Sequence, residues 1–156
     1  MAVGTPPFQA LLDAHRRDVY RFLVAAVGPV EADDCFQETF LAALRAYPRL
    51  RDHSNLRAWV LTIAHRKAID AHRSRRRIAV PVESVPERPA PAAADGEPAL
   101  WEAVRALPHK QRAAILCRYV SDLPYAEIGH VVGCSEESAR QNVRAGLANL
   151  RGAWTE

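Results

Sequence analysis

A stretch rich in proline near the middle of the chain most limits how this sequence can fold. Residues 79–98 contain five prolines, and a proline interrupts the hydrogen bonding of a helix or of a central strand. The residues between these prolines are mostly small or charged, so the segment has little apolar surface to bury. We therefore predict an unfolded linker over residues 79–98, between one module of residues 1–78 and another of residues 99–156.

The charge of the chain follows the same division. Residues 1–78 carry 13 Lys and Arg against 8 Asp and Glu, or +5, and the linker carries 1 against 4, or −3. Residues 99–156 carry 7 against 6, or +1. The net charge of +3 is therefore the sum of a basic module, an acidic linker and a nearly neutral module.

Several classes of protein are disfavoured by what the sequence lacks. No apolar run approaches the roughly 20 residues needed to cross a bilayer, and residues 1–9 lack the basic and apolar parts of a secretory signal. The three cysteines form no Cys-x-x-Cys pair, the six histidines form no HExxH motif, and no glycine-rich phosphate loop is present. We therefore expect a cytoplasmic protein that is not an enzyme and holds no metal or cofactor.

The spacing of apolar residues predicts three helices in the N-terminal module and no strand. The first begins at Phe8 and ends at Gly28-Pro29, and the second runs from near Val30 to Tyr47. Asn55 is suited to cap the third helix, which extends to about residue 77. The predicted apolar face of the second helix is Cys35, Phe36, Thr39, Phe40, Ala43 and Leu44.

The third predicted helix ends in a dense group of cations that face a single carboxylate, Asp70. Such a group occurs at solvated helix ends, where arginine side chains interact favourably with the helix dipole. It also occurs where a protein contacts nucleic acid phosphates, and binding then depends steeply on salt. Both interpretations fit the residues Arg66, Lys67, Arg73, Arg75, Arg76 and Arg77.

The C-terminal module is also predicted to be helical, and it ends in a helix-turn-helix. Leu100, Val104 and Leu107 mark a short helix, and Pro108 suits the first position of the next. That second helix is expected to turn Ala114, Ile115, Leu116, Tyr119 and Val120 inward. The helix-turn-helix then follows as residues 125–132, Gly133 in a left-handed conformation, Ser135 as a cap, and residues 136 to about 151. The predicted fold class is therefore all-α.

The last predicted helix places polar residues on its outward side. Ala139, Val143, Leu147 and Leu150 recur on one face, so a different set forms an outward ridge. Such side chains can read base edges in the major groove, since arginine pairs with guanine and glutamine with adenine. Two helices with a tight turn also occur in plain bundles, and a module at +1 is expected to bind DNA weakly alone. The ridge consists of Glu137, Arg140, Gln141 and Arg144.

Taken together, these features resemble the extracytoplasmic-function (ECF) sigma factors of bacterial RNA polymerase, which contain only conserved regions 2 and 4. Residues 33–40, DDCFQETF, are similar to the D-x-x-Q-E-x-F motif of region 2. Residues 55–64, NLRAWVLTIA, are similar to the run that opens the promoter-melting helix. Leu107-Pro108, residues 123–129 (LPYAEIG) and the helix after Ser135 match region 4.

The resemblance implies roles for residues of the first module. Asp34, Gln37 and Glu38 would contact the clamp helices of the largest polymerase subunit. The loop of residues 50–54 and the start of the third helix would capture a flipped base of the non-template −10 strand, through His53, Ser54 and Asn55. The phosphates of that strand would be held by Arg66, Lys67, Arg73, Arg75, Arg76 and Arg77.

For the second module, the resemblance implies that the outward ridge reads the −35 element and that region 4 contacts the polymerase flap. Promoter DNA and an anti-sigma factor are the other implied partners, with no membrane insertion. Two positions depart from the family: Arg66 replaces a frequent Asn, and Ala145 replaces a usual Arg. The next residue, Gly146, costs helix stability and therefore predicts close packing. The alternative function is a stand-alone helix-turn-helix regulator that binds duplex DNA without polymerase.

Overall fold

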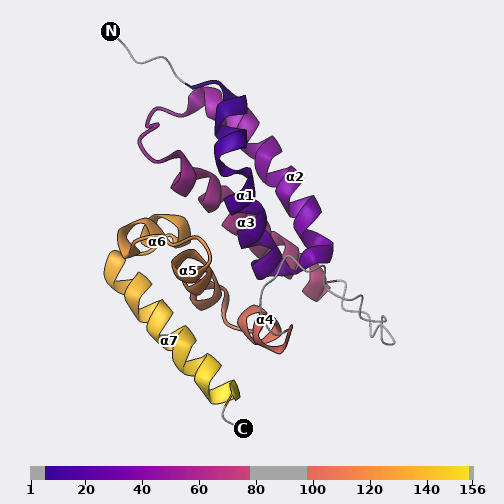
Figure 1. Cartoon of the computed structure of the whole chain (residues 1–156), viewed down its shortest axis with the longest axis vertical. Coiled ribbons are helices and arrows are strands. Elements are labelled where there is room, and N and C mark those ends of the chain that lie inside the picture. The colour runs from indigo at the N-terminus through magenta and orange to yellow at the C-terminus, as the bar shows by residue number, and fades with distance from the viewer. Residues whose placement is uncertain (1–5, 78–97, 155–156) are drawn as a thin grey trace.

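The computed structural model describes residues 6–77 and 98–154, and every regular element in these two ranges is a helix. The predicted all-α fold class is confirmed. The predicted linker lies outside the described residues, except Pro98, which begins a helix. Figure 1 shows the helices in chain order. They are α1 Phe8–Val27, α2 Pro29–Ala46, the 3-10 turn η1 Tyr47–Arg49, α3 Leu56–Arg77, α4 Pro98–Arg105, α5 His109–Tyr119, α6 Tyr125–Val132 and α7 Glu136–Trp154.

Helices α1, α2 and α3 pack against one another, and their ends lie where the sequence predicts them. Gly28 joins α1 to α2 with φ at 87°, a left-handed value that favours glycine. The side-chain oxygen of Asn55 accepts a hydrogen bond from the backbone N–H of Ala58 at 3.1 Å, as expected of an N-cap. The inner faces of the three helices bury large apolar side chains such as Phe22 and Leu61.

Helices α6 and α7 form the predicted helix-turn-helix. Gly133 ends α6 in the left-handed conformation, with φ at 81°, and the hydroxyl of Ser135 accepts a hydrogen bond from the backbone N–H of Ser138 at 3.0 Å. A Cβ on Gly129 would lie 2.6 Å from the backbone oxygen of Cys134, so only glycine lets the turn approach α6 this closely. Both the turn and the cap were predicted, and both are confirmed.

The C-terminal helices also pack against the N-terminal ones. Helix α6 contacts α3, and α4 and α5 contact α1, whereas α7 packs mainly on α5 and α6. Figure 1 shows α7 on the outer side of this arrangement, away from α2. Buried apolar side chains from both halves join in one continuous core. In the part of the chain that the structure describes, no helix is long and apolar enough to cross a membrane.

Three local predictions were wrong. Leu44 and Tyr119 were expected inward, but they are 49% and 61% exposed. The buried face of α2 is centred on Ala32, Thr39 and Ala43, so Leu44 falls at its edge. Tyr119 is the last residue of α5, beyond the stretch that other helices cover. Pro108, expected as the first helical residue, is instead the N-cap of α5 with extended backbone.

Candidate functional site

One face of α2 carries polar side chains that are exposed and take no part in the hydrophobic core. Asp34, Gln37 and Glu38 are all exposed, as the sequence predicts of a contact surface. Two leucines, Leu41 at 52% exposure and Leu44 at 49%, extend this polar set toward the end of the helix. The spacing of 34, 37, 38 and 41 places these residues on one side of a helix. We call Asp34, Gln37, Glu38, Leu41 and Leu44 the α2 face.

Sequence reasoning missed the two leucines of this face. Apolar residues are assigned to the inside by default, and Leu44 fits the periodicity of the buried stripe within one position. The signal that could have found Leu41 is its separation of three from Glu38 and of seven from Asp34, which excludes it from the buried face. Exposed leucines beside carboxylates are typical of protein–protein contact surfaces.

The loop before α3 is held in place by short-range contacts. The backbone N–H of Ser54 donates to the Asp52 carboxylate at 2.9 Å. Hydrogen bonds from the side chain and the backbone of Ser54 hold the pKa of Asp52 below its ordinary value. The ring of His53 meets that of Tyr47 edge to face, with centroids 5.5 Å apart. The amide of Asn55 caps α3. The predicted residues His53, Ser54 and Asn55 therefore occupy one ordered turn.

The cations at the end of α3 do not share one environment. Arg66, Arg73 and Arg77 are exposed, and Lys67 is half-buried. Arg75 is exposed as well, and it forms an ion pair with Glu31 of α2 at the surface. The side chain of Arg76 lies outside the described residues. The structure therefore brings Arg66, Arg73, Arg75 and Arg77 to the surface, where Arg75 is paired with Glu31.

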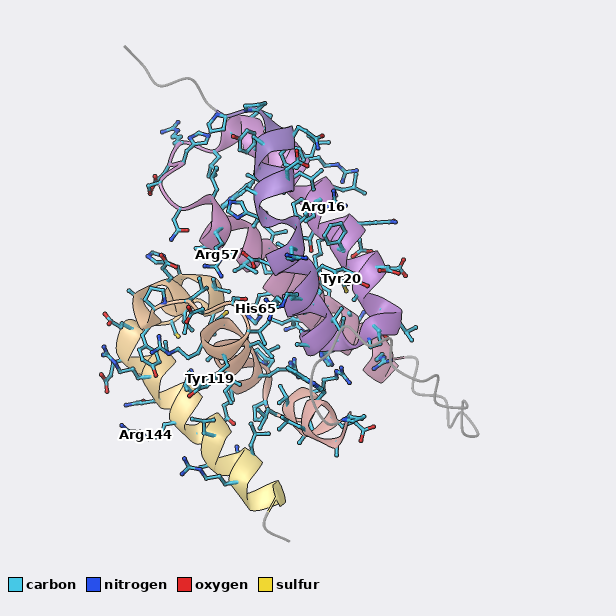
Figure 2. All side chains as sticks on the ribbon, in the orientation of Figure 1. Arg16, Tyr20, Arg57, His65, Tyr119 and Arg144 are labelled. Atoms are coloured by element: carbon cyan, nitrogen blue, oxygen red, sulfur yellow. The ribbon has the colours of Figure 1, made fainter. Side chains whose placement is uncertain are left out.

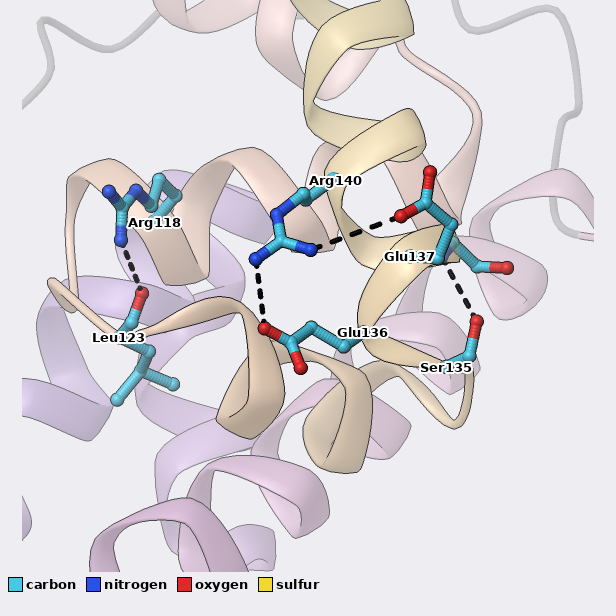
Figure 3. A network of polar contacts seen from close by, with 7 residues as sticks. Arg118, Leu123, Ser135, Glu136, Glu137 and Arg140 are labelled. Atoms are coloured by element: carbon cyan, nitrogen blue, oxygen red, sulfur yellow. Dashed lines mark hydrogen bonds and ion pairs between the residues drawn. The ribbon is translucent and has the colours of Figure 1, made fainter.

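The predicted ridge on α7 is exposed, but one of its arginines is engaged. Figure 3 shows Arg140 between two carboxylates, Glu136 at 2.9 Å and Glu137 at 3.9 Å. The guanidinium of Arg140 also lies 5.2 Å from the centre of the Tyr125 ring. Gln141 and Arg144 are exposed on the same helix. To contact a base or phosphate, Arg140 would have to exchange carboxylate contacts for DNA.

Two side chains at the start of α3 contact the C-terminal half, one on α6 and one on the loop before α6, which the sequence does not reveal. The Asn55 amide donates to the Glu127 carboxylate at 2.7 Å. The guanidinium of Arg57 donates to the backbone oxygen of Ser121 and lies 3.2 Å from the Asp18 carboxylate. Figure 2 shows Arg57 and His65 on the side of α3 that faces the C-terminal helices.

The fold defines an all-helical protein that ends in a helix-turn-helix, and comparisons with known proteins give its family. Residues 11–78 match the model of sigma-70 region 2, and residues 98–150 match that of sigma-70 region 4. The ECF RNA polymerase sigma factor SigD of Mycobacterium tuberculosis is 35% identical, over 90% of this chain and 74% of its own length. The RNA polymerase sigma factor CarQ of Myxococcus xanthus is 29% identical, over 92% of this chain and 87% of its own length.

Solved structures agree on the fold. The sigma factor RpoE from Bartonella quintana, solved with the anti-sigma factor NepR, superposes with a TM-score of 0.76 at 24% identity, over 93% of this chain and 94% of that one. CnrH, solved with the cytosolic domain of CnrY, gives a TM-score of 0.68 at 19% identity, over 94% of this chain and 86% of that one.

The chain belongs to the extracytoplasmic-function sigma factors of RNA polymerase. As a member of this family it binds core polymerase and directs promoter-specific initiation. Of the two functions considered from the sequence, this assignment supports the polymerase-dependent one.

Proposed function

We propose that the α2 face is the surface through which this sigma factor binds the clamp helices of the largest polymerase subunit. The observation that carries the proposal is the combination of exposed polar residues and exposed leucines on one side of α2. A mixed surface of this kind suits a specific protein contact. Leucines that become buried in the complex supply affinity, and charged side chains supply orientation. Asp34, Gln37 and Glu38 would fix the orientation, and Leu41 and Leu44 would be covered in the complex.

We propose that the turn before α3 captures a flipped base of the −10 non-template strand. Base capture needs an aromatic or planar group for stacking and polar groups for the base edge. The His53 ring, the Ser54 hydroxyl and the Asn55 amide supply these in three consecutive residues. The exposed Arg66, Arg73 and Arg77, with Lys67, would hold the phosphates, and Arg75 would join them only after release from Glu31.

For the −35 element, we propose reading by the α7 ridge of Glu137, Arg140, Gln141 and Arg144. A recognition helix enters the major groove with its N-terminal residues on the base edges, and these four residues occupy the first half of α7. The flap of the polymerase would hold region 4 against the core.

We further propose an organisation for the whole chain. Residues 1–78 and 99–156 would act as separate modules joined through 79–98, and the catalysis would belong entirely to the polymerase. The protein would be held in check by an anti-sigma factor, as the RpoE complex with NepR illustrates for a protein of the same fold.

Core binding by α2-face variants tests the proposal. We expect fluorescently labelled protein to bind core polymerase, and Leu41→Ala with Leu44→Ala to weaken binding at least tenfold while helix content is unchanged. The matched control is Tyr119→Ala, since Tyr119 is a comparably exposed large apolar residue at the end of α5, on a different helix from this face. Equal binding by all three proteins would overturn the assignment of the α2 face.

A further inference from the structure

Tyr125, the first residue of α6, has two guanidinium groups over its ring. The central carbon of the Arg118 guanidinium, from α5, lies 4.6 Å from the ring centre, and that of Arg140, from α7, lies 5.2 Å from it. Both distances are within the roughly 6 Å over which the face of an aromatic ring attracts a cation. One half-buried ring therefore links α5 to the helix that we assign to the −35 element.

The position of this ring does not depend on Arg140. On the α5 side, the guanidinium of Arg118 donates to the backbone oxygen of Leu123 at 3.2 Å, and Leu123 is fully buried just before α6 begins. Figure 3 shows this hydrogen bond beside the start of α6. Arg118 thus fixes both the backbone that leads into α6 and a charge over the ring. Of the two arginines at the ring, Arg140 is the exposed one.

Arg140 has two kinds of contact, and only one kind competes with a base. Its N–H groups face the carboxylates of Glu136 at 2.9 Å and of Glu137 at 3.9 Å. Arginine reads guanine through the same N–H groups, so a base has to replace carboxylate oxygens there. The Tyr125 ring attracts the cation through its π face instead, and this contact can persist while the N–H groups turn to a base.

We infer that Tyr125 is a positioning residue for promoter recognition: its ring holds the guanidinium of Arg140 where it reads a guanine of the −35 element. A long side chain that is held before DNA arrives loses less freedom on binding, so more of its interaction appears as discrimination between bases. The inference rests on the proposed reading of this element by α7. It adds a determinant of specificity that lies outside the recognition helix.

Selection of DNA by the holoenzyme tests this role. Core polymerase carrying each variant is mixed with a duplex library of random sequence, and the bound DNA is sequenced. Arg140→Ala is expected to reduce the preference at one upstream base pair by about fivefold or more. Tyr125→Leu should reduce the preference at the same pair by about threefold, the effect of losing one exposed cation–π contact. Tyr125→Phe keeps the ring and should retain the preference.

Two comparisons separate positioning from a general structural effect. If the ring acts through Arg140, Tyr125→Leu changes nothing further in the Arg140→Ala background. The matched control Tyr119→Leu removes a more exposed ring from the end of α5 and should leave the preferences unchanged. Circular dichroism checks that each variant is folded, and Tyr125→Met, a second replacement without a ring, repeats the test if Tyr125→Leu is not.

A spectroscopic signature in the free protein reports the contact itself. A proton over the face of an aromatic ring resonates at higher field, so the Nε–H signal of Arg140 should move downfield in Tyr125→Leu. It should stay close to the wild-type position in Tyr125→Phe. The corresponding signal of Arg144, one turn further along α7, is the internal reference.

The outcomes distinguish this inference from the proposal on which it rests. If Arg140→Ala changes the preferences but Tyr125→Leu does not, α7 still reads the element and the positioning role is wrong. A loss in Tyr125→Leu that is spread over all base pairs, or an unshifted Arg140 signal, would also overturn the positioning role. If Arg140→Ala leaves every preference unchanged, the proposed reading by Arg140 fails, and the inference fails with it.

Discussion

At the scale of single residues, two glycines determine how closely the C-terminal helices approach each other. A Cβ on Gly146 would lie 2.3 Å from the Cδ1 atom of Ile115, so a side chain at this position would have to displace the end of the Ile115 side chain of α5. The sequence predicted close packing here from the helix cost of glycine alone, and the prediction is confirmed. Gly129 likewise lets the turn after α6 approach closely. There the atom that a Cβ would meet is the backbone oxygen of Cys134.

We predict that Gly129→Ala destabilises the protein by about 2 kcal/mol, as expected of overpacking against a backbone that cannot yield. The control is Gly152→Ala, because a Cβ at Gly152 meets nothing within 4 Å. Urea unfolding followed by circular dichroism compares the two variants with the wild type. Equal midpoints for both variants would show that the turn near Cys134 accommodates the methyl group.

The buried His65 makes a second residue-scale prediction, on pH. Burial, together with the nearby charges of His109, Arg112 and Arg66, lowers the pKa of His65 to about 4. Between about pH 6.5 and pH 4 the unfolded chain binds a proton that the folded chain does not, so stability is lost as the pH falls through this range.

Wild type should therefore lose about 2 kcal/mol more stability than His65→Gln between about pH 7 and pH 5, measured by urea unfolding at each pH. The pKa values of His15 and His72 are also lowered, mainly by burial, and both residues remain in the variant, so a smaller loss persists there. Identical losses for the two proteins would show that His65 titrates normally in the folded state.

At the scale of elements, helix limits and caps were predictable because they depend on short-range chemistry. Gly28-Pro29, Asn55, Gly133 and Ser135 each act on backbone within a few residues, and each lies where the sequence placed it. The direction of individual side chains was less predictable. Leu44 and Tyr119 were assigned inward by hydrophobicity, although helix packing leaves both in solvent.

For α2, we predict that Glu38→Lys weakens core binding by about tenfold or more, since it reverses a charge at the proposed interface. Unfolding stability should change by less than about 0.5 kcal/mol, because the side chain is exposed. Titration of labelled protein with core polymerase measures the affinity, and Glu102→Lys on α4 is the matched charge reversal. A loss of stability equal to the loss of binding would point to a structural role.

For α3, we predict that Arg73→Ala with Arg77→Ala slows open-complex formation and reduces its salt dependence. Each lost phosphate contact lowers the slope of log affinity against log salt by about one. The comparison is Arg75→Ala, which should also lower stability because it leaves Glu31 without its ion pair. An unchanged slope in the double variant would favour a solvated helix end.

At the scale of the whole molecule, the packing of the two halves could not be predicted. Periodicity and capping describe each helix, but the contacts of Asn55 with Glu127 and of Arg57 with Ser121 join residues more than 60 positions apart. Neither pair leaves a local pattern in the sequence. The sequence therefore predicted the helices and the candidate surfaces, whereas the occupation of one surface by the other half was visible only in three dimensions.

The most direct test of the central claim is transcription reconstituted from purified core polymerase, this protein and fragments of genomic DNA. The account predicts discrete transcripts with a common pair of upstream elements when the wild type is added. It predicts few or none with Glu38→Lys, and transcripts at the same start sites with Glu102→Lys. Transcripts that are independent of the added protein, or equally abundant with Glu38→Lys, would contradict it.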